Sequence, residues 1–519
     1  MKKLLIATLV CCSASAMAQI PEDALRYSWY PQNGTARTLA IGGAMGSLGG
    51  DISATFVNPA GIGFFKTNEF VLSPGFLLNS NRLAFRGENT NTKKNGFGLG
   101  TSGFVFGAGN NFNLKQHVAF SLAITQTANF NNRTDFTGLN NFSSFSEQFA
   151  EEFVRSGLSI GEVLNTNSDL PYTAAPALNA FLIDTFRVNG RLQVKGIPEL
   201  LLDSGLALRQ NYSRQTSGGL YEVGLGAAIN NENWLFGASV GIPLVYYKSN
   251  TTFSESDTSF NTKNGFKSFT YADNFTTTGA GINVKLGAIY RPATYFRLGI
   301  ALHTPSYLVL SDERTTNLST NLETPSGASE SFNESSTSYS GGQPGLNKYT
   351  QSSAWRAIVS ASYVFREIEN VAKQRAFITA DLEYVNHKGS RFTNNNEVGV
   401  STGGSSTNYF KSLNTVVKEQ YRGTFNARAG GELKFNTVMA RLGVAYYGNP
   451  YTDRSLKANR LLLSSGLGYR NKGVFVDLTY VHQVTKDVNF PYRLADRANS
   501  FASINNTAGN VVATIGFKF

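Results

Sequence analysis

The most constraining feature of this sequence is a two-residue alternation between apolar and small or polar residues over long stretches. In residues 421–435, YRGTFNARAGGELKF, every second residue from Tyr421 on is apolar or glycine, and the residues between them include arginine, asparagine, glutamate and lysine. Residues 234–242, 280–290 and 296–303 repeat this pattern. Because successive side chains of a β-strand point to opposite faces, each stretch predicts a strand with one apolar face.

The lengths of these stretches distinguish a soluble β-sandwich from a transmembrane barrel. Soluble sheets usually have strands of about 5 to 6 residues, whereas a tilted strand that crosses a membrane needs about ten. Stretches of about ten residues or more recur along this chain, and we expect about fourteen of them. The expected starts lie near residues 68, 98, 116, 218, 233, 279, 295, 352, 375, 420, 438, 460, 473 and 509.

The connections between the expected strands alternate in length. Tight connections are expected at Glu232, residues 291–294, residues 436–437 and residues 471–472, and the connections between them are long and rich in Ser, Thr and Asn. Short periplasmic turns and long extracellular loops are typical of outer-membrane barrels, and an even strand count places both termini in the periplasm. The predicted fold class is therefore all-β, a transmembrane antiparallel β-barrel of about fourteen strands.

The composition excludes several other classes of protein. After residue 18 no window approaches the ~20 apolar residues of a membrane-spanning helix, which argues against a helical membrane protein. The formal net charge is +11, but the lysines and arginines are scattered singly, so we expect no nucleic-acid partner. No linker or composition break divides the chain, which favours one large closed architecture.

The N-terminus has the pattern of a secretory signal peptide. Two lysines precede an apolar run at residues 4–12, and small residues end at Ala18, after which we expect cleavage. Both cysteines of the chain, Cys11 and Cys12, lie in this segment, so the mature protein would have no disulfide, thiolate metal site or cysteine nucleophile. A lipid anchor is not expected, because Val10 rather than a small residue precedes the first cysteine.

Two regions do not alternate, residues 19–67 and the expected loop 131–217. The loop contains two helical patterns, one with phenylalanines at intervals of four and one with an apolar face. Amphipathic helices in a loop need an apolar surface to cover. They could form a groove that captures an apolar ligand, or they could pack on one another and keep the loop folded. The residues concerned are Phe145, Phe149 and Phe153 in the first pattern and Leu178, Phe181, Leu182 and Phe186 in the second.

The segment before the first strand is rich in glycine and contains a turn at Asn58, Pro59, Ala60 and Gly61. This segment resembles the plug of the FadL/TodX-type transporters of long-chain fatty acids and aromatic hydrocarbons, which carries an Asn-Pro-Ala motif just before the first strand. The resemblance extends to the expected number of strands and to the phrases GAIYRPATYFRLGIALHTP and ARAGGELKF. The last strand, GNVVATIGFKF, alternates and ends on an aromatic residue, as in barrels that are handed to the outer-membrane assembly machinery.

The resemblance implies three parts: a signal peptide at 1–18, an N-terminal plug or hatch inside the lumen at 19–67, and a multi-pass barrel at 68–519 whose largest loop is 131–217. It also implies passive uptake of small hydrophobic molecules, long-chain fatty acids or hydrocarbons, across a Gram-negative outer membrane. An external groove would capture the ligand, and the ligand would leave sideways through an opening in the wall. The implied partners are outer-membrane lipid, the hydrophobic ligand and, during biogenesis, the barrel assembly machinery.

Candidate ligand-binding residues follow from this implied function. A fatty acid needs a partner for its carboxylate, and Arg297, Arg428 and Arg441 have the lumen parity of their strands. Alternatively, lumen arginines pair with lumen carboxylates such as Glu432 and stabilise the wall. The loop phenylalanines Phe149, Phe153 and Phe181 are the candidates for an apolar groove; the plug motif is Asn58, Pro59, Ala60 and Gly61.

The sequence gives no indication of catalysis. The four histidines, His117, His303, His387 and His482, are far apart, and no pair has metal-ligand spacing. No GxSxG motif occurs at a strand-to-helix turn. We therefore expect no enzyme, no catalytic residue, no metal and no cofactor.

Two other functions remain open at this stage. One is a structural or accessory barrel of a secretion or assembly complex, because PorV-type secretion partners resemble the same family. The other is an adhesin, which the Ser, Thr and Asn content of the loops would allow. A partner-binding loop would present a flat apolar surface, whereas a transporter would present a concave groove that leads into the lumen.

Overall fold

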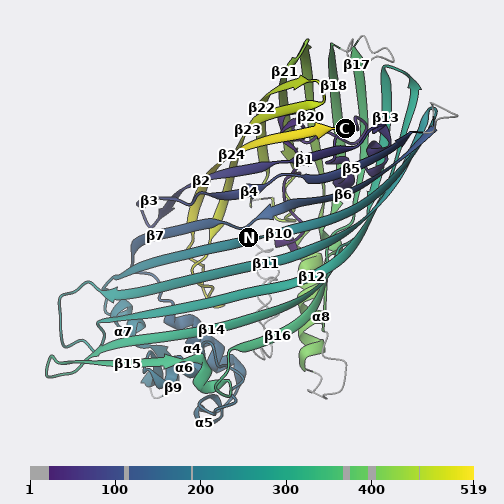
Figure 1. Cartoon of the computed structure of the whole chain (residues 1–519). Coiled ribbons are helices and arrows are strands. Elements are labelled where there is room, and N and C mark those ends of the chain that lie inside the picture. Colours follow the sequence, from purple (N-terminus) through teal and green to yellow (C-terminus); the bar gives the residue numbers. More distant parts are fainter. Residues whose placement is uncertain are drawn as a thin grey trace.

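The computed structural model describes residues 23–109, 116–188, 191–365, 375–394, 405–454, 456 and 458–519. The expected signal peptide and residues 19–22 lie outside these described residues. Figure 1 shows one barrel of long strands, with the C-terminus and tight turns at one end and helices α4 to α7 at the other. We call these the short-turn end and the long-loop end.

The strands close into one antiparallel barrel, because β24 at the C-terminus pairs with both β1 and β2 at the start of the wall. Counted around the ring, the described strands form fourteen wall segments, as predicted. In ring order these segments are β1 (Glu69–Leu72) with β2 (Pro74–Phe85), β3 (Glu88–Lys93) with β4 (Gly96–Leu99) and β5 (Ser102–Gly109), β6 (Gln116–Asn129) with β7 (Asn132–Asn140), β10 (Leu208–Asn231), β11 (Trp234–Asp257), β12 (Ser268–Ala293), β13 (Phe296–His303) with β14 (Tyr307–Glu323), β16 (Gly345–Ser352) with β17 (Arg356–Phe365), β18 (Ala376–Asn386) with β19 (Arg391–Asn394), β20 (Gly423–Phe435), β21 (Val438–Tyr447), β22 (Arg460–Asn471), β23 (Val474–Asn489) and β24 (Ala502–Lys518).

The outward face of the wall carries an apolar band, which β11 shows most clearly. Every second residue of β11 from Trp234 to Tyr246 is apolar and exposed, and every second residue from Lys248 to Ser256 is polar. The apolar stretch is long enough for a tilted strand to cross a membrane, which takes about 9 to 11 residues. The remainder of β11 therefore extends beyond the membrane at the long-loop end. Among the described residues, no helix is both long and apolar enough to span a membrane.

The apolar band predicts the effect of a charge on its face. Leu286 on β12 points outward within the band and is half exposed, so Leu286→Arg is expected to lower the free energy of unfolding by ~2 to 4 kcal/mol. The matched control is Asn274→Arg, which lies on the same face of the same strand beyond the band and should change little. Denaturant titrations of the refolded barrel in lipid vesicles measure both, and equal costs would contradict the position of the band.

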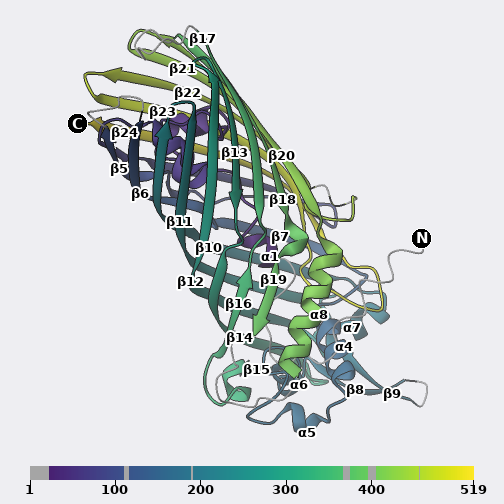
Figure 2. The ribbon, with the colours of Figure 1, turned by 90° about the vertical axis from the view of Figure 1, so that its right-hand side faces the viewer.

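The N-terminal segment, residues 23–68, lies inside the barrel (Figure 2). Its hydrogen bonds run largely to lumen residues of the wall, among them Ala36 N to Thr514 Oγ1 at 2.8 Å and Ser239 Oγ to Thr55 O at 2.8 Å. The segment contains four short helical elements joined by glycine-rich turns. These are α1 (Asp23–Arg26), α2 (Ala36–Ala40), α3 (Ala54–Val57) and η1 (Pro59–Phe64).

Lumen-facing glycines of the wall let the N-terminal segment approach the strands closely. A Cβ atom at Gly287 would overlap Asn58 Oδ1, and one at Gly430 would overlap the Ile41 carbonyl. Lumen-facing glycines in several strands therefore leave room for the N-terminal segment. They do not indicate that these strands are weak.

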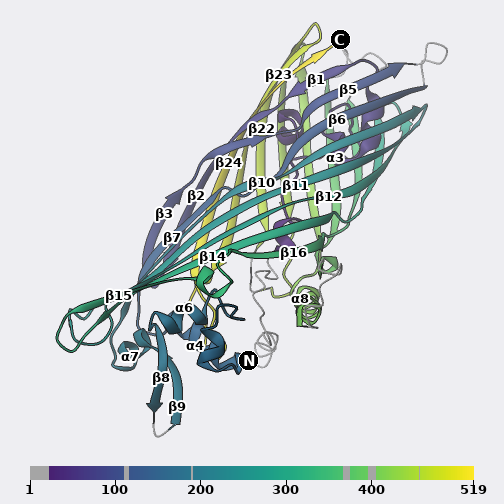
Figure 3. The same cartoon turned by 60° about the horizontal axis from the view of Figure 1, so that its bottom comes forward.

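The long loop after β7 folds into a compact unit of helices and one hairpin. The sequence places the loop at 131–217, whereas the structure shortens it to 141–207, which we call the loop cap. The flanking strands continue beyond the membrane, where Phe136 of β7 and Tyr212 of β10 are buried and Arg133 and Asn211 are exposed. Figure 3 shows the cap and its projecting hairpin at the long-loop end. The cap contains α4 (Ser146–Ser156), α5 (Ile160–Val163), α6 (Ala174–Asn179), β8 (Ile183–Val188), β9 (Arg191–Gly196) and α7 (Ile197–Asp203).

The cap packs on the inner face of the extended wall and forms the largest buried apolar cluster of the described chain. Smaller elements complete this end of the molecule: β15 (Ser329–Ser335), which forms a hairpin with β14, η2 (Ser336–Tyr339), η4 (His387–Gly389) and α8 (Ser405–Gln420). The inward residues of the wall in the cluster are Leu83, Phe85, Phe136, Tyr212, Phe253, Phe269, Tyr271 and Leu318.

Candidate functional site

Strand pairing around the barrel is interrupted at one place between the second and third wall segments. β5 pairs with β6 from Ser102 onward, but no ladder joins residues 88–101 to residues 125–140 in the described structure, where β3 pairs with β2 and β7 pairs with β10. We call the part of this gap between residues 96–101 and 125–131 the wall break. Side chains join its two edges instead: Leu99 N donates to Gln126 Oε1 at 3.2 Å, and Asn129 Nδ2 donates to the Phe97 carbonyl at 3.1 Å.

The N-terminal segment reaches into the wall break and bonds both edges. Asn33 Nδ2 donates to the Leu99 carbonyl at 3.0 Å and to the Gln126 carbonyl at 2.7 Å. The amide of Thr101 donates to the Gly34 carbonyl at 3.1 Å. One residue pair of the N-terminal segment therefore takes the place that a neighbouring strand has elsewhere in the wall.

Local sequence explains why the ladder stops here. The register of β6 against β10 shifts around Thr127, which is left as an extra residue, the pattern of a β-bulge. The Asn131 amide then bonds Asn129 Oδ1 at 2.9 Å, a local turn that ends β6. On the other edge, the Gly100 amide turns to the Ser73 carbonyl at 2.8 Å. Each edge thus satisfies its backbone groups without pairing with the other.

A small cavity of about 40 Å³ inside the lumen adjoins the wall break. Its lining combines aromatic surface from the N-terminal segment, Tyr30 and Phe56, with hydroxyl and amide groups of the wall. Asn33 belongs both to this lining and to the side chains that bridge the break. The cavity therefore ends at the wall break. Its hydroxyl and amide groups come from Gln32 and Asn33 of the N-terminal segment and from Thr125, Thr127, Asn283, Thr304, Ser306 and Ser353 of the wall.

The cations at the cavity already have partners within the protein. Lys285 Nζ forms an ion pair with Glu222 and donates to Asn283 Oδ1 at 2.7 Å. Arg356 stacks over the Tyr30 ring at 4.4 Å and donates to a backbone carbonyl of the N-terminal segment. The lining therefore offers aromatic rings and hydroxyl groups to a ligand, around a space that holds a few water molecules.

The predicted lumen arginines point inward, but they bond the N-terminal segment and other wall strands. Arg297 donates to the Leu48 carbonyl at 2.7 Å and stacks over Phe64 at 4.5 Å. Arg428 pairs with Glu383 at 2.7 Å. None of the three arginines lines the cavity. Their contact with a ligand stays a prediction.

Arg441 illustrates the alternative of pairing with lumen carboxylates. Its guanidinium donates to Glu432 at 2.6 Å and to Asp477 at 2.5 Å, and its side chain is fully buried. The pairing anticipated for Glu432 is therefore present, and Arg441 on β21 also reaches Asp477 on β23 across the intervening β22.

The three loop phenylalanines differ in their surroundings. Phe149 and Phe153 are buried within the loop cap, whereas Phe181 is 48% exposed and contacts Phe332 with ring centroids 4.9 Å apart. The first two residues thus keep the cap folded. Phe181 remains a candidate for the capture of an apolar ligand.

The plug motif lies in the lumen toward the short-turn end. Asn58 Nδ2 donates to the Gly46 carbonyl at 2.6 Å and Asn58 Oδ1 accepts from the Ala60 amide at 3.1 Å, so the side chain joins the turn to an earlier part of the N-terminal segment. Pro59 and Gly61 are buried beside it.

Two groups of the site were missed by sequence reasoning. Asn33 and Gln126 bridge the wall break, although both edges belong to regions in which the alternation fails. In β6 the alternation of exposed and buried residues ends at Ile124, and a polar run follows it. His303 lines the cavity, and its Nε2 lies 2.8 Å from the Val57 carbonyl.

The structure resembles two solved proteins over almost their whole length. A Pseudomonas aeruginosa FadL homologue matches with a TM-score of 0.54 and 13% identity over 95% of this chain and 100% of that one. The Pseudomonas putida toluene transporter TodX matches with a TM-score of 0.51 and 12% identity over 94% and 99% of the two chains. The chain has the FadL-type fold. At these identities the likeness shows the fold and leaves the ligand open. No family model and no curated protein matches the sequence.

Proposed function

We propose that this chain is an outer-membrane channel of a Gram-negative cell for the passive uptake of small hydrophobic molecules, long-chain fatty acids or hydrocarbons. The observation that carries the proposal is that the lumen cavity ends at the wall break. Outside the break lies the apolar face of the wall, where Phe97 is 83% exposed and Phe76 is partly exposed beside it. A ligand could thus pass from the lumen into lipid without crossing the barrel along its axis.

The physics of an apolar ligand favours this lateral route. Burial of apolar surface lowers the free energy by ~25 cal/mol per Å², so a ligand held by Tyr30 and Phe56 would gain nothing by leaving into water. Lipid offers it an apolar environment directly. The barrier at the wall break consists of a few hydrogen bonds between side chains and backbone, each of which contributes about 0.5 to 1.5 kcal/mol.

The N-terminal segment is proposed to act as a plug that blocks the axial route. Its buried contacts continue from the cavity to Asn58 and Pro59 near the short-turn end, which would face the periplasm. The loop cap would then face the cell exterior. The fold is shared with a protein named as a toluene transporter and with a FadL homologue, which supports the ligand class.

Filling the cavity at the wall break tests the route. Thr127→Trp would place an indole in the cavity at the bulge and is expected to reduce uptake of hydrophobic ligands to the level of a deletion strain. The control is Thr252→Trp, the same exchange on the outward face of β11 beyond the apolar band. Uptake of radiolabelled fatty acids and aromatic hydrocarbons is compared in the deletion strain complemented with each variant.

The outcomes distinguish a transport function from an accessory role of the barrel. If the wild-type chain raises uptake of none of the ligands above the deletion strain, the transport proposal fails and an accessory role is favoured. If Thr127→Trp transports as well as Thr252→Trp, the ligand does not use the cavity at the wall break.

A further inference from the structure

A buried polar network joins the loop cap to the wall at the start of α4, inside an otherwise aromatic cluster. Glu255 lies on β11 and is fully buried. It accepts hydrogen bonds from Ser144 Oγ at 2.5 Å, from the Phe145 amide at 2.8 Å and from Gln210 Nε2 at 2.7 Å. The carboxyl group of one wall strand therefore holds the first residues of the cap.

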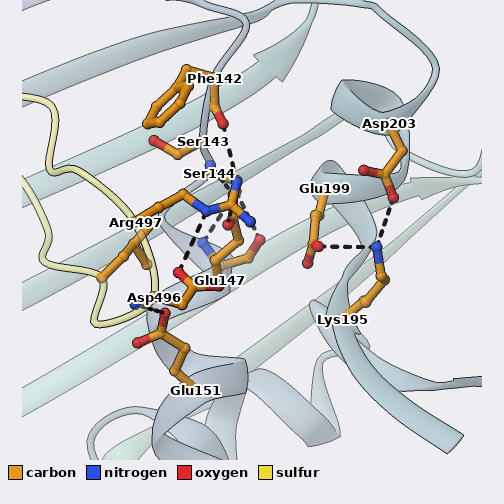
Figure 4. A network of polar contacts seen from close by, with 12 residues as sticks. Phe142, Ser143, Ser144, Glu147, Glu151, Lys195, Glu199, Asp203, Asp496 and Arg497 are labelled. Carbon is orange, nitrogen blue, oxygen red and sulfur yellow. Dashed lines mark hydrogen bonds and ion pairs between the residues drawn. The ribbon is translucent and has the colours of Figure 1, made fainter.

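A second buried carboxyl group holds the same serine. Glu147, in the first turn of α4, accepts the Ser144 amide at 2.7 Å and is 5% exposed. Figure 4 shows Glu147 between Ser144 and Arg497. Glu147, which belongs to the cap, thus bonds the Ser144 amide. Glu255, which belongs to the wall, bonds the Ser144 hydroxyl and the Phe145 amide.

The surroundings of the two carboxyl groups contain more acidic groups than cations to pair with them. Arg497, in the loop before β24, lies 3.1 Å from Glu147 and is shared with Asp496 at 3.4 Å. Lys195 forms ion pairs with Glu199 and Asp203. Among the described residues, the titratable groups that face the pair are Tyr492, Asp496 and Arg497 from the last loop, Glu199 from α7, Lys195 from β9, Tyr271 from β12 and Glu151 from α4.

Both carboxyl groups lie beyond the apolar band, and burial changes their protonation. Burial raises the pKa of Glu147 and of Glu255 from 4.5 to about 7, although the hydrogen bonds they accept act in the opposite direction. Because these values exceed the ordinary one, the closed cap favours the protonated form. The stabilisation is complete below about pH 4.5 and is lost as pH rises through about 7.

We propose that Glu147 and Glu255 form a proton-controlled latch that holds the loop cap against the wall when protonated and loosens it when both are ionised. Two negative charges in an aromatic cluster, with one shared arginine, would repel each other and draw water to the start of α4. Loosening would free the cap over the long-loop end of the lumen. The latch is independent of the proposed transport; only its consequence for ligand access rests on that function.

Distance measurements between the cap and the wall test the latch. Spin labels are placed at Val154→Cys on α4 and Asn250→Cys on β11, both exposed, in full-length mature protein in lipid nanodiscs. Both native cysteines lie in the expected signal peptide. The distance distribution is expected to be narrow near pH 5 and broader and longer near pH 8.5, with a midpoint near 7.

The variants distinguish the latch from a general effect of pH. Glu147→Gln with Glu255→Gln imitates the protonated pair and is expected to keep the narrow distribution at both pH values. Glu162→Gln, on the exposed capping box of α5 in the same cap, should behave as wild type. Heat-modifiable migration on gels checks that each variant folds. A wild-type distribution that does not change with pH, or a double variant that broadens as wild type does, would overturn the latch whatever the uptake assays show.

Discussion

Deletion of residues 20–60 is expected to open the barrel to small polar solutes and to abolish selective handling of hydrophobic ones. The segment fills the lumen through hydrogen bonds to wall residues, and its apolar side chains pack in clusters that it shares with the wall. The wall does not depend on it for closure, because the strands pair with one another. Single-channel conductance in planar bilayers should rise from closed to open, and liposome swelling with sugars should become fast.

A milder variant controls for damage to the barrel. Gly430→Val places a side chain against the backbone of the N-terminal segment at Ile41, whereas Ala429→Val places the same side chain on the outward face. The first variant should leak and the second should not, while both keep heat-modifiable migration. If the deletion leaves solute passage unchanged, the segment is not a lumen plug, and an accessory role for the barrel gains support.

Arg441→Met is expected to cost ~3 to 5 kcal/mol of unfolding free energy, the largest stability effect of a single substitution that the structure predicts. The exchange keeps much of the side-chain volume but leaves Glu432 and Asp477 buried without the cation that they share. Two uncompensated carboxylates between neighbouring strands are more costly than the loss of the attraction itself. Urea titration of the refolded protein in vesicles measures the change.

Two controls locate the effect. Arg155→Met removes an exposed arginine that pairs with Glu151 in the loop cap and should cost at most about 1 kcal/mol. Adding Glu432→Gln and Asp477→Asn to Arg441→Met should recover most of the lost unfolding free energy, because no uncompensated carboxylate then remains. Equal costs for Arg441→Met and Arg155→Met would contradict a structural role for the buried triad.

The alternation predicts the wall well where the strand borders lipid. The outward residues of β11 within the band follow the predicted parity, and the tight connections occur where expected. The starts of β10 and β12, expected near 218 and 279, lie at Leu208 and Ser268. Beyond the membrane the outward residues are polar, so these strand ends have no apolar outward face to reveal them.

The candidate site was less predictable because it joins distant parts of the chain. The parity of Arg441 places it in the lumen, but its partners depend on the register of four strands, β20 to β23, which no local pattern specifies. Asn33 bonds Gln126 across 93 positions of sequence. The loss of alternation after Ile124 could have marked the edge of the wall break, but nothing local identifies the N-terminal residues that fill it.

Photolabelling gives the most direct test of lateral passage. Cells that express the wild-type chain take up a hydrophobic probe with a diazirine, are illuminated, and the modified peptides are mapped by mass spectrometry. The proposed function predicts labels on the cavity at Tyr30 and Thr127 and on the outer edge of the wall break at Phe97, and loss of the Tyr30 label in Thr127→Trp. Labels confined to the outward apolar band, as from probe dissolved in lipid alone, would contradict passage through the lumen.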